Sequence, residues 1–129
     1  MKVDYKIYKE HKLIVEVISG DITIEGLADK TNTLFSDPGY DVNYVGVADY
    51  RLAVSQITRA ELYGFANFIN KSDQFGKSKW AIIANDPMVV ALSHVFQQRL
   101  LDQSKIGIFN SPIAASKFIE KPVLLDLLK

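Results

Sequence analysis

The chain has 129 residues, of which 48% are apolar and 23% charged, a composition that suits one globular domain with a single buried core. Its fifteen basic residues balance fifteen acidic ones, so no net field draws a polyanion or an anionic membrane surface to the whole molecule, and nucleic acid is not an expected partner. Because the chain also lacks cysteine, an apolar signal-peptide core and a run of about 18 apolar residues, we expect a cytoplasmic protein without disulfides, a cysteine-based zinc site or a transmembrane segment.

The first two predicted elements form a hairpin. Val3, Tyr5 and Ile7 alternate with polar residues, which is the period-2 pattern of an edge strand with one face in water. The apolar run 13–18 is interrupted only by Glu16 and predicts a more buried strand that pairs with the first.

Helical spacing follows the hairpin. After Thr23, apolar residues recur at i, i+3, i+4 and i+7 over 24–35, and the Asp-Pro-Gly of 37–39 ends this predicted helix. The run 44–48, YVGVA, predicts a central strand covered on both faces, followed by a polar loop that contains Ser55.

Three further helices are predicted from their first residues. Thr58 and Glu61 have the spacing of a capping box, and Asp86 and Ser111 each stand before a proline, as an N-cap stands before a first helical residue. The third helix, 87 to about 101, is expected to bury one apolar face against the core: Met88, Ala91, Leu92, Val95 and Phe96. The runs 80–84 and 106–109 predict the fourth and fifth strands.

The resulting order is β-β-α-β-α-β-α-β-α, which predicts an α/β fold with a mixed, mainly parallel five-stranded sheet and helices packed on it. Residues 1–120 are expected to form a single domain. The apolar tail 121–129 is too short for a stable isolated helix, so it is expected to pack either on its own core or on a second protomer.

This order, with HKLIVEVISGDITIEGL as second strand and first helix and YVGVADYR as third strand, resembles the STAS-like (SpoIIAA-like) superfamily over about residues 3–120. The best-known members are bacterial anti-sigma-factor antagonists, and the likeness is closest to stand-alone bacterial proteins of unsettled function. In the antagonists the third strand enters an Asp-Ser-Ser/Thr-Gly turn with a phosphorylated serine. The matching Asp49-Tyr50-Arg51-Leu52 has no phosphoacceptor serine and no glycine, so the switch is not carried over, and Ser55 is interpreted as ordinary loop chemistry.

Two groups of candidate site residues follow from the predicted fold. Loops at the carboxyl ends of parallel strands often bind ligands, which makes a candidate rim of Asp49, Tyr50, Arg51, Asn85, Asp86, Asn110 and Ser111. Capping alone also explains Asp86 and Ser111. A candidate protein interface combines the outer stripe of the third helix with the tail: Val90, His94, Gln97, Leu101, Leu124 and Leu128.

No catalytic, metal or cofactor motif is found in the sequence. It has no G-x-S-x-G elbow, P-loop or G-x-G-x-x-G turn, and its two histidines, His11 and His94, are not in metal-ligand spacing. We therefore predict no enzyme activity and no cofactor. The predicted function is a regulatory protein-interaction module that can form a homodimer. The alternative is a carrier or sensor of a small apolar ligand or lipid, in a cavity lined by Phe65, Phe68, Trp80, Phe96 and Phe118.

Overall fold

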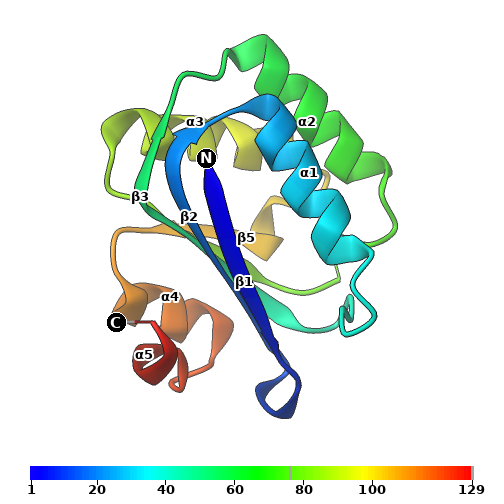
Figure 1. The fold of residues 1–129 in the computed structure, drawn as a ribbon, viewed down its shortest axis with the longest axis vertical. Helices are drawn as coiled ribbons and strands as arrows, with labels where there is room; N and C mark the ends of the chain where they lie inside the picture. Colours follow the sequence, from blue (N-terminus) through cyan, green and yellow to red (C-terminus); the bar gives the residue numbers. More distant parts are fainter. Residues whose placement is uncertain (76, 129) are drawn as a thin grey trace.

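The computed structural model describes residues 1–75 and 77–128. Its strands and helices follow the predicted order, with a short fifth helix in the tail (Figure 1). The strands are β1 (Lys2–Tyr8), β2 (Leu13–Ile22), β3 (Val45–Ser55), β4 (Trp80–Ile83) and β5 (Ile106–Phe109), and the helices are α1 (Ile24–Phe35), α2 (Arg59–Lys71), α3 (Pro87–Arg99), α4 (Pro112–Ile119) and α5 (Leu124–Leu127). Within the described residues, none of the helices is long and apolar enough to cross a bilayer.

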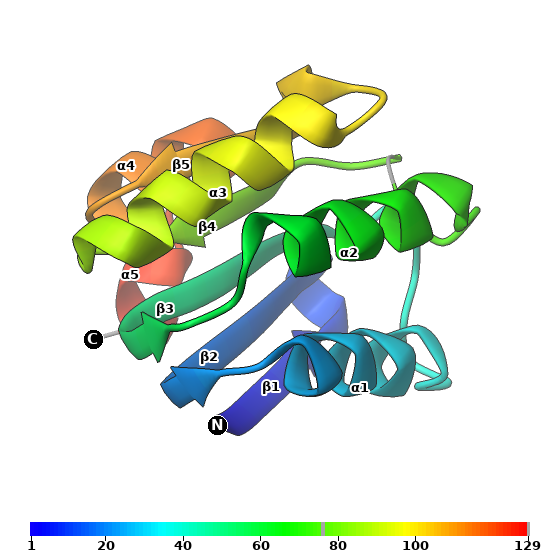
Figure 2. The same cartoon turned by 90° about the horizontal axis from the view of Figure 1, so that it is seen from above.

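The five strands form one sheet in the order β1-β2-β3-β4-β5, in which β1 is antiparallel to β2 and the other neighbours are parallel. Each crossover from β2 to β5 moves one strand further in the same direction. Crossovers of one hand therefore place α1, α2 and α3 on the same face of the sheet, while α4 and α5 cover the other face (Figure 2). This is the predicted α/β architecture with a mixed, mainly parallel sheet.

Side chains alternate between two cores, one on each face of the sheet. On the face of α4 and α5, Leu13, Val15 and Val47 pack with residues of both helices. On the face of α1, α2 and α3, Ile14 and Ile18 of β2 enter two adjoining clusters. Strands β4 and β5 and the first residues of β2 and β3 are covered on both faces, and their sequences are mainly apolar.

Gly46 is required by a close approach between two strands. It lies beside Trp80 in the β3–β4 register, and a Cβ at this position would stand 2.4 Å from three atoms of the indole ring. The indole therefore lies directly over the backbone of β3, on the α1–α3 face of the sheet.

The third strand is longer than the sequence pattern predicts. It continues through the expected polar loop to Ser55, because a β-bulge places Tyr50 and Arg51 opposite the single residue Ile18 of β2. A bulge shifts the alternation of side chains by one residue. As a result, four side chains of β3 face α1–α3: Ala48 and Tyr50, and then Ala53 and Ser55 beyond the shift. Strict alternation would not place all four on one face.

The inner face of α3 also differs from the expected one. Val89, Leu92 and Ser93 are buried, whereas Met88 is 54% exposed and Ala91 is exposed. The helix is apolar on several sides, so periodicity alone does not define which stripe packs inward, and the docking onto β3 and β5 decides it. Helix α3 ends at Arg99, two residues earlier than expected.

The predicted helix starts are confirmed. Thr58 and Glu61 form a reciprocal capping box, in which the Glu61 N–H donates to Thr58 Oγ1 at 3.1 Å and the Thr58 N–H donates to Glu61 Oε1 at 2.9 Å. Asp86 Oδ2 accepts from the N–H groups of Met88 and Val89, and Ser111 Oγ accepts from the N–H of Ala114. These side chains satisfy backbone donors that the first helical turn leaves free.

The described part of the tail lies against the chain's own core. Leu124 and Leu128 are buried in the α4/α5-side cluster together with Leu13, Ala115 and Ile119. These two leucines are therefore not at the surface of the chain, and their expected place in an interface is corrected: they pack on the α4/α5 face of the sheet instead. Lys129 of the predicted tail lies outside the described residues.

Candidate functional site

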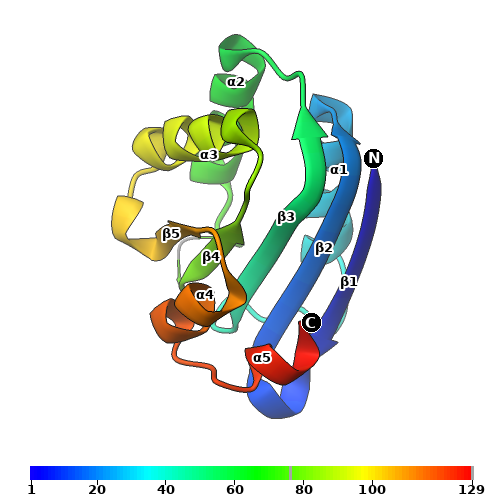
Figure 3. The ribbon, with the colours of Figure 1, turned by 90° about the vertical axis from the view of Figure 1, so that its left-hand side faces the viewer.

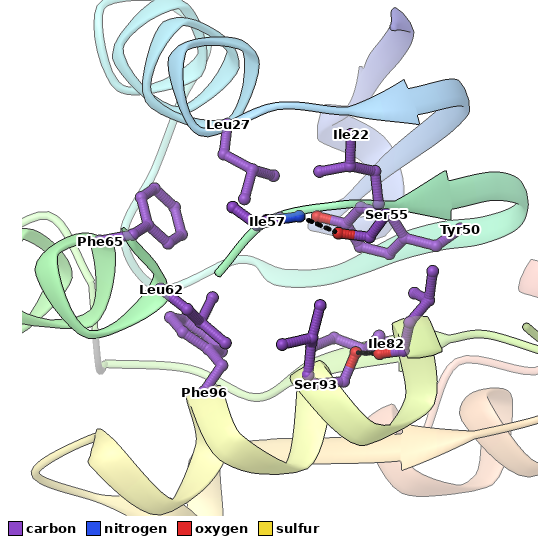
Figure 4. A pocket seen from close by; sticks show the side chains of 12 residues that line it. Ile22, Leu27, Tyr50, Ser55, Ile57, Leu62, Phe65, Ile82, Ser93 and Phe96 are labelled. Atoms are coloured by element: carbon purple, nitrogen blue, oxygen red, sulfur yellow. Dashed lines mark hydrogen bonds between the residues drawn. The ribbon is translucent and has the colours of Figure 1, made fainter. Parts of the chain in front are cut away.

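Two small cavities lie side by side between the sheet and helices α1, α2 and α3. Each has a volume of about 70 Å³ and almost wholly apolar walls. The Ser93 cavity is bounded by Ile22, Leu27, Ser55, Ile57, Leu62, Val89, Leu92 and Ser93 (Figure 4). The Lys30 cavity is bounded by Glu16, Lys30, Thr31, Leu34, Phe35, Ala48, Ile69, Phe75, Trp80 and Ile106.

Four side chains belong to both cavities and form the partition between them: Tyr50, Phe65, Ile82 and Phe96. The rings of Phe65 from α2 and Phe96 from α3 lie 5.7 Å apart between centroids, an ordinary aromatic contact. Tyr50 approaches from the sheet on β3, on the same α1–α3 face as Ala48 two residues earlier.

An ion pair is buried in the wall of the Lys30 cavity. Glu16 on β2 is only 1% exposed, and its oxygens Oε1 and Oε2 accept hydrogen bonds from Lys30 Nζ at 3.2 and 3.4 Å. Burial lowers the pKa of Lys30, but attraction to Glu16 and Tyr50 outweighs it, and the pKa lies above its usual value of 10.5. Lys30 therefore keeps its ammonium form in the interior, where the Glu16 carboxylate compensates its charge.

Tyr50 places a hydroxyl beside this ion pair. Burial raises its pKa above the usual 10.0, and the charge of Glu16 adds to the increase while the Lys30 ammonium opposes it. The phenol is therefore protonated at neutral pH and can both donate and accept a hydrogen bond. The Lys30 cavity thus has one polar corner in an otherwise apolar surface.

The remaining hydroxyls of the two cavities already have backbone partners. Ser93 Oγ donates to the Val89 carbonyl oxygen at 2.7 Å, Thr31 Oγ1 donates to that of Leu27 at 2.8 Å, and Ser55 Oγ accepts from the Ile57 N–H at 3.2 Å. Ser55, the serine of the expected loop, therefore stabilises the turn between β3 and α2 and also lines the Ser93 cavity.

The predicted rim does not form one loop cluster. Asp49 and Arg51 lie within β3 and form an ion pair. Arg51 Nε donates to Asp49 Oδ1 at 3.0 Å, and Arg51 Nη2 donates to Asp49 Oδ2 at 2.9 Å. Figure 3 shows β3 and β2 extending past β4, which pairs with β3 only as far as Asp49. Because the strand order never reverses, the sheet also lacks the crevice that a reversal opens at its carboxyl edge.

The other rim residues lie together at the ends of β4 and β5. With its nitrogen turned towards them, the Asn85 amide donates to the carbonyl oxygens of Ala84 and Asn110 at 3.1 Å. Asp86 and Ser111 cap α3 and α4. Tyr50 differs from all of these, because it enters both cavities.

The predicted interface is divided between the two faces of the sheet. On α3, His94 is exposed and Leu101, just beyond the helix, is 85% exposed, whereas Gln97 Nε2 donates to the Ile106 carbonyl oxygen at 2.7 Å. Val90 is half-buried against the α1–α3 side. Leu124 and Leu128 lie on the opposite face, so the six residues do not make one continuous surface.

The sequence alone does not predict the polar corner, because neither Glu16 nor Lys30 differs locally from a solvated residue, yet it contains a trace of the pair. Glu16 is the one charge in the apolar run 13–18, and Lys30 interrupts the inner stripe of α1 between Leu27 and Leu34. A charge on each of two apolar faces is the expected pattern of a buried pair. Three of the five expected aromatic residues line the cavities: Phe65, Trp80 and Phe96. Phe118 packs against Phe109 on the other face of the sheet, and Phe68 is 39% exposed.

Within residues 1–75 and 77–128, no group of three or more histidine, aspartate or glutamate side chains is arranged to hold a metal ion.

Scans against protein-family models and curated protein sequences find no match to this chain. Among solved structures, it is similar to an uncharacterised protein from Shewanella loihica PV-4, described as a DUF3478 family protein with a SpoIIAA-like fold. The two structures superpose with a TM-score of 0.60 over 91% of this chain and 93% of that chain, at 15% sequence identity. The chain thus has a SpoIIAA-like, STAS-like fold, as its element order predicts, and this likeness shows the fold alone.

Proposed function

We propose that the chain is a non-catalytic binding protein, which holds a small and mainly apolar molecule between the sheet and helices α1–α3. The proposal depends on one observation: two adjoining apolar cavities share the side chains of Tyr50, Phe65 and Phe96. Together the two cavities have twice the volume of either one. An apolar cavity of similar size, about 150 Å³, stays dry and binds benzene.

Burial of an apolar molecule in this space is favourable because it removes apolar surface from water, at about 25 cal/mol per Å². Most ligand sites in proteins are concave, mainly apolar and carry a few polar groups that orient the ligand. The Glu16–Lys30 pair and the Tyr50 hydroxyl supply such groups at one end.

The test is NMR titration with benzene and toluene, with the indole N–H of Trp80 as a reporter, since the chain has a single tryptophan and it lines the Lys30 cavity. We expect saturable shifts at Trp80, Phe65 and Phe96. Thr31→Met places a longer side chain in the Lys30 cavity and should abolish the shifts. The exposed neighbour Asn32→Met is the matched control and should leave them unchanged. Absence of saturable shifts in the wild-type protein, or equal binding by both variants, would overturn the proposal.

A second candidate is a regulatory protein-interaction module in the cytoplasm, which can form a homodimer. It is favoured by large apolar side chains in water, above all Leu101 at 85% and Leu52 at 72% exposure. Light scattering after size-exclusion chromatography over a dilution series tests the homodimer. Leu101→Ser should shift the dimer towards monomer, and a wild-type monomer at micromolar concentration would contradict this assembly.

A further inference from the structure

The polar corner of the Lys30 cavity restricts the charge that a ligand can carry. Lys30 Nζ lies within hydrogen-bond distance of both Glu16 oxygens, so its charge is already compensated inside the protein. The Glu16 side chain is only 2% exposed and the Lys30 side chain 10% exposed. Water can therefore do little to stabilise either charge if the pair is separated.

An anionic ligand would have to compete with Glu16 for the Lys30 ammonium. If it displaced Glu16, a carboxylate would remain buried and unpaired, which is among the most costly arrangements in a protein interior. If it bound beside Glu16, two negative charges would approach each other in a medium of low polarity. Either arrangement opposes carboxylates and other anions.

An uncharged polar group meets neither cost. A hydroxyl or carbonyl can accept a hydrogen bond from Lys30 or Tyr50 without separating the ion pair, and a hydroxyl can also donate to Tyr50. The apolar remainder of the molecule would then lie along Phe65, Ile82 and Phe96, where Tyr50 separates the two cavities. Glu16 and Lys30 line the Lys30 cavity and not the Ser93 cavity, so the ion pair also fixes the direction of the ligand.

We infer that this cavity selects uncharged molecules with one hydroxyl or carbonyl group at the Glu16–Lys30–Tyr50 corner and an apolar body across the Tyr50 partition, and that it rejects carboxylates of the same size. The inference rests on the proposed function, because it specifies the ligand class of the same cavities.

Three probes with seven carbon atoms test it: toluene, benzyl alcohol and benzoate at pH 7.5, each titrated into the 129-residue chain with Trp80 as the NMR reporter. We expect benzyl alcohol to bind at least about tenfold more tightly than benzoate, a difference in binding free energy of about 1.4 kcal/mol. Tyr50→Phe keeps the ring but loses the hydroxyl, and should reduce the preference for benzyl alcohol over toluene.

Glu16→Gln should reverse the selectivity, because it keeps the shape of the side chain but leaves the Lys30 ammonium without its counter-charge, which benzoate can then supply. Glu25→Gln, an exposed acid in the first turn of α1, is the matched control and should retain the wild-type order. Wild-type protein that binds benzoate as tightly as benzyl alcohol overturns the inference, although the proposed function would then stand. If toluene, benzyl alcohol and benzoate all fail to bind, the proposed function fails as well. The wild-type comparison decides the matter even if Glu16→Gln does not fold.

Discussion

Lys30 on α1 and Glu16 on β2 form an ion pair that is almost completely shielded from water, with Lys30 Nζ at 3.2 Å from Glu16 Oε1. It joins the first crossover helix to the interior strand beneath it. A pair of this kind is costly to break from one side, because the remaining charge stays buried without a partner.

Lys30→Met should therefore destabilise the protein by about 3–5 kcal/mol in urea unfolding. The exposed pair of Lys2 and Asp4, 3.7 Å apart, supplies the control, since Lys2→Met should cost less than about 1 kcal/mol. The double variant Glu16→Leu with Lys30→Met removes both charges and should recover most of the loss. A double variant as unstable as Lys30→Met alone would contradict this account.

The same pair predicts the behaviour of stability in alkali. Burial works against the charge of Lys30, but attraction to Glu16 and Tyr50 keeps its pKa above the usual 10.5. A group with a raised pKa in the folded state stabilises fully below its unfolded pKa and loses this contribution as the pH rises further. The free energy of unfolding should thus fall above about pH 10.5 in the wild type, and the fall should be shallower in the double variant.

Gly46→Ala should destabilise the protein by about 1–3 kcal/mol, because the new Cβ would stand 2.4 Å from the Trp80 ring and force the indole or β3 to move. The Trp80 fluorescence maximum should shift at the same time. Gly64→Ala is the matched control. Gly64 lies within α2 with no atom near its absent Cβ, so alanine there should stabilise by about 0.5–1 kcal/mol through helix propensity alone. Equal effects of the two substitutions would argue against the close approach of Trp80 to Gly46.

Asp37 should titrate below its usual range. The Tyr5 hydroxyl donates to Asp37 Oδ2 at 2.6 Å, the Gly39 N–H donates to Oδ1 at 2.8 Å, and together these bonds lower the pKa of the carboxyl from 3.8. A lowered pKa stabilises the folded protein above the unfolded value, and the contribution is lost as the pH falls through the folded value. In NMR titration Tyr5→Phe should raise the pKa of Asp37. The ring of Tyr8 packs on the opposite face of the sheet, so Tyr8→Phe should not change the pKa of Asp37.

The elements that the sequence predicts well are those whose causes are local. The capping box of Thr58 and Glu61 and the proline after Asp86 define helix starts within four residues of chain, and these starts are correct. The alternation of Val3, Tyr5 and Ile7 likewise defines β1 without reference to any other segment. The sequential parallel order follows from short crossovers of one hand.

What the sequence does not predict depends on contacts between distant segments. The extension of β3 to Ser55 requires the bulge opposite Ile18, and in isolation the polar Asp49 and Arg51 suggest a loop. The cavity corner requires Glu16 and Lys30, fourteen positions apart, to meet across the sheet–helix interface. Neither polar residue differs locally from a solvated one, so only the tertiary structure brings the candidate site together.

Leu124 and Leu125 are neighbours in α5 with opposite environments: Leu124 is completely buried in the α4/α5-side core, and Leu125 is 41% exposed. Leu124→Ala should therefore cost about 2–5 kcal/mol of unfolding free energy, because it removes apolar contacts and leaves a cavity that the four-residue helix can only partly close. Leu125→Ala makes the same chemical change and should cost less than about 1 kcal/mol. Urea unfolding at two protein concentrations measures both values and separates the two roles of the tail. If the tail packs on its own core, the cost of Leu124→Ala is independent of concentration; a cost that grows with protein concentration would indicate that α5 is stabilised by a second protomer instead.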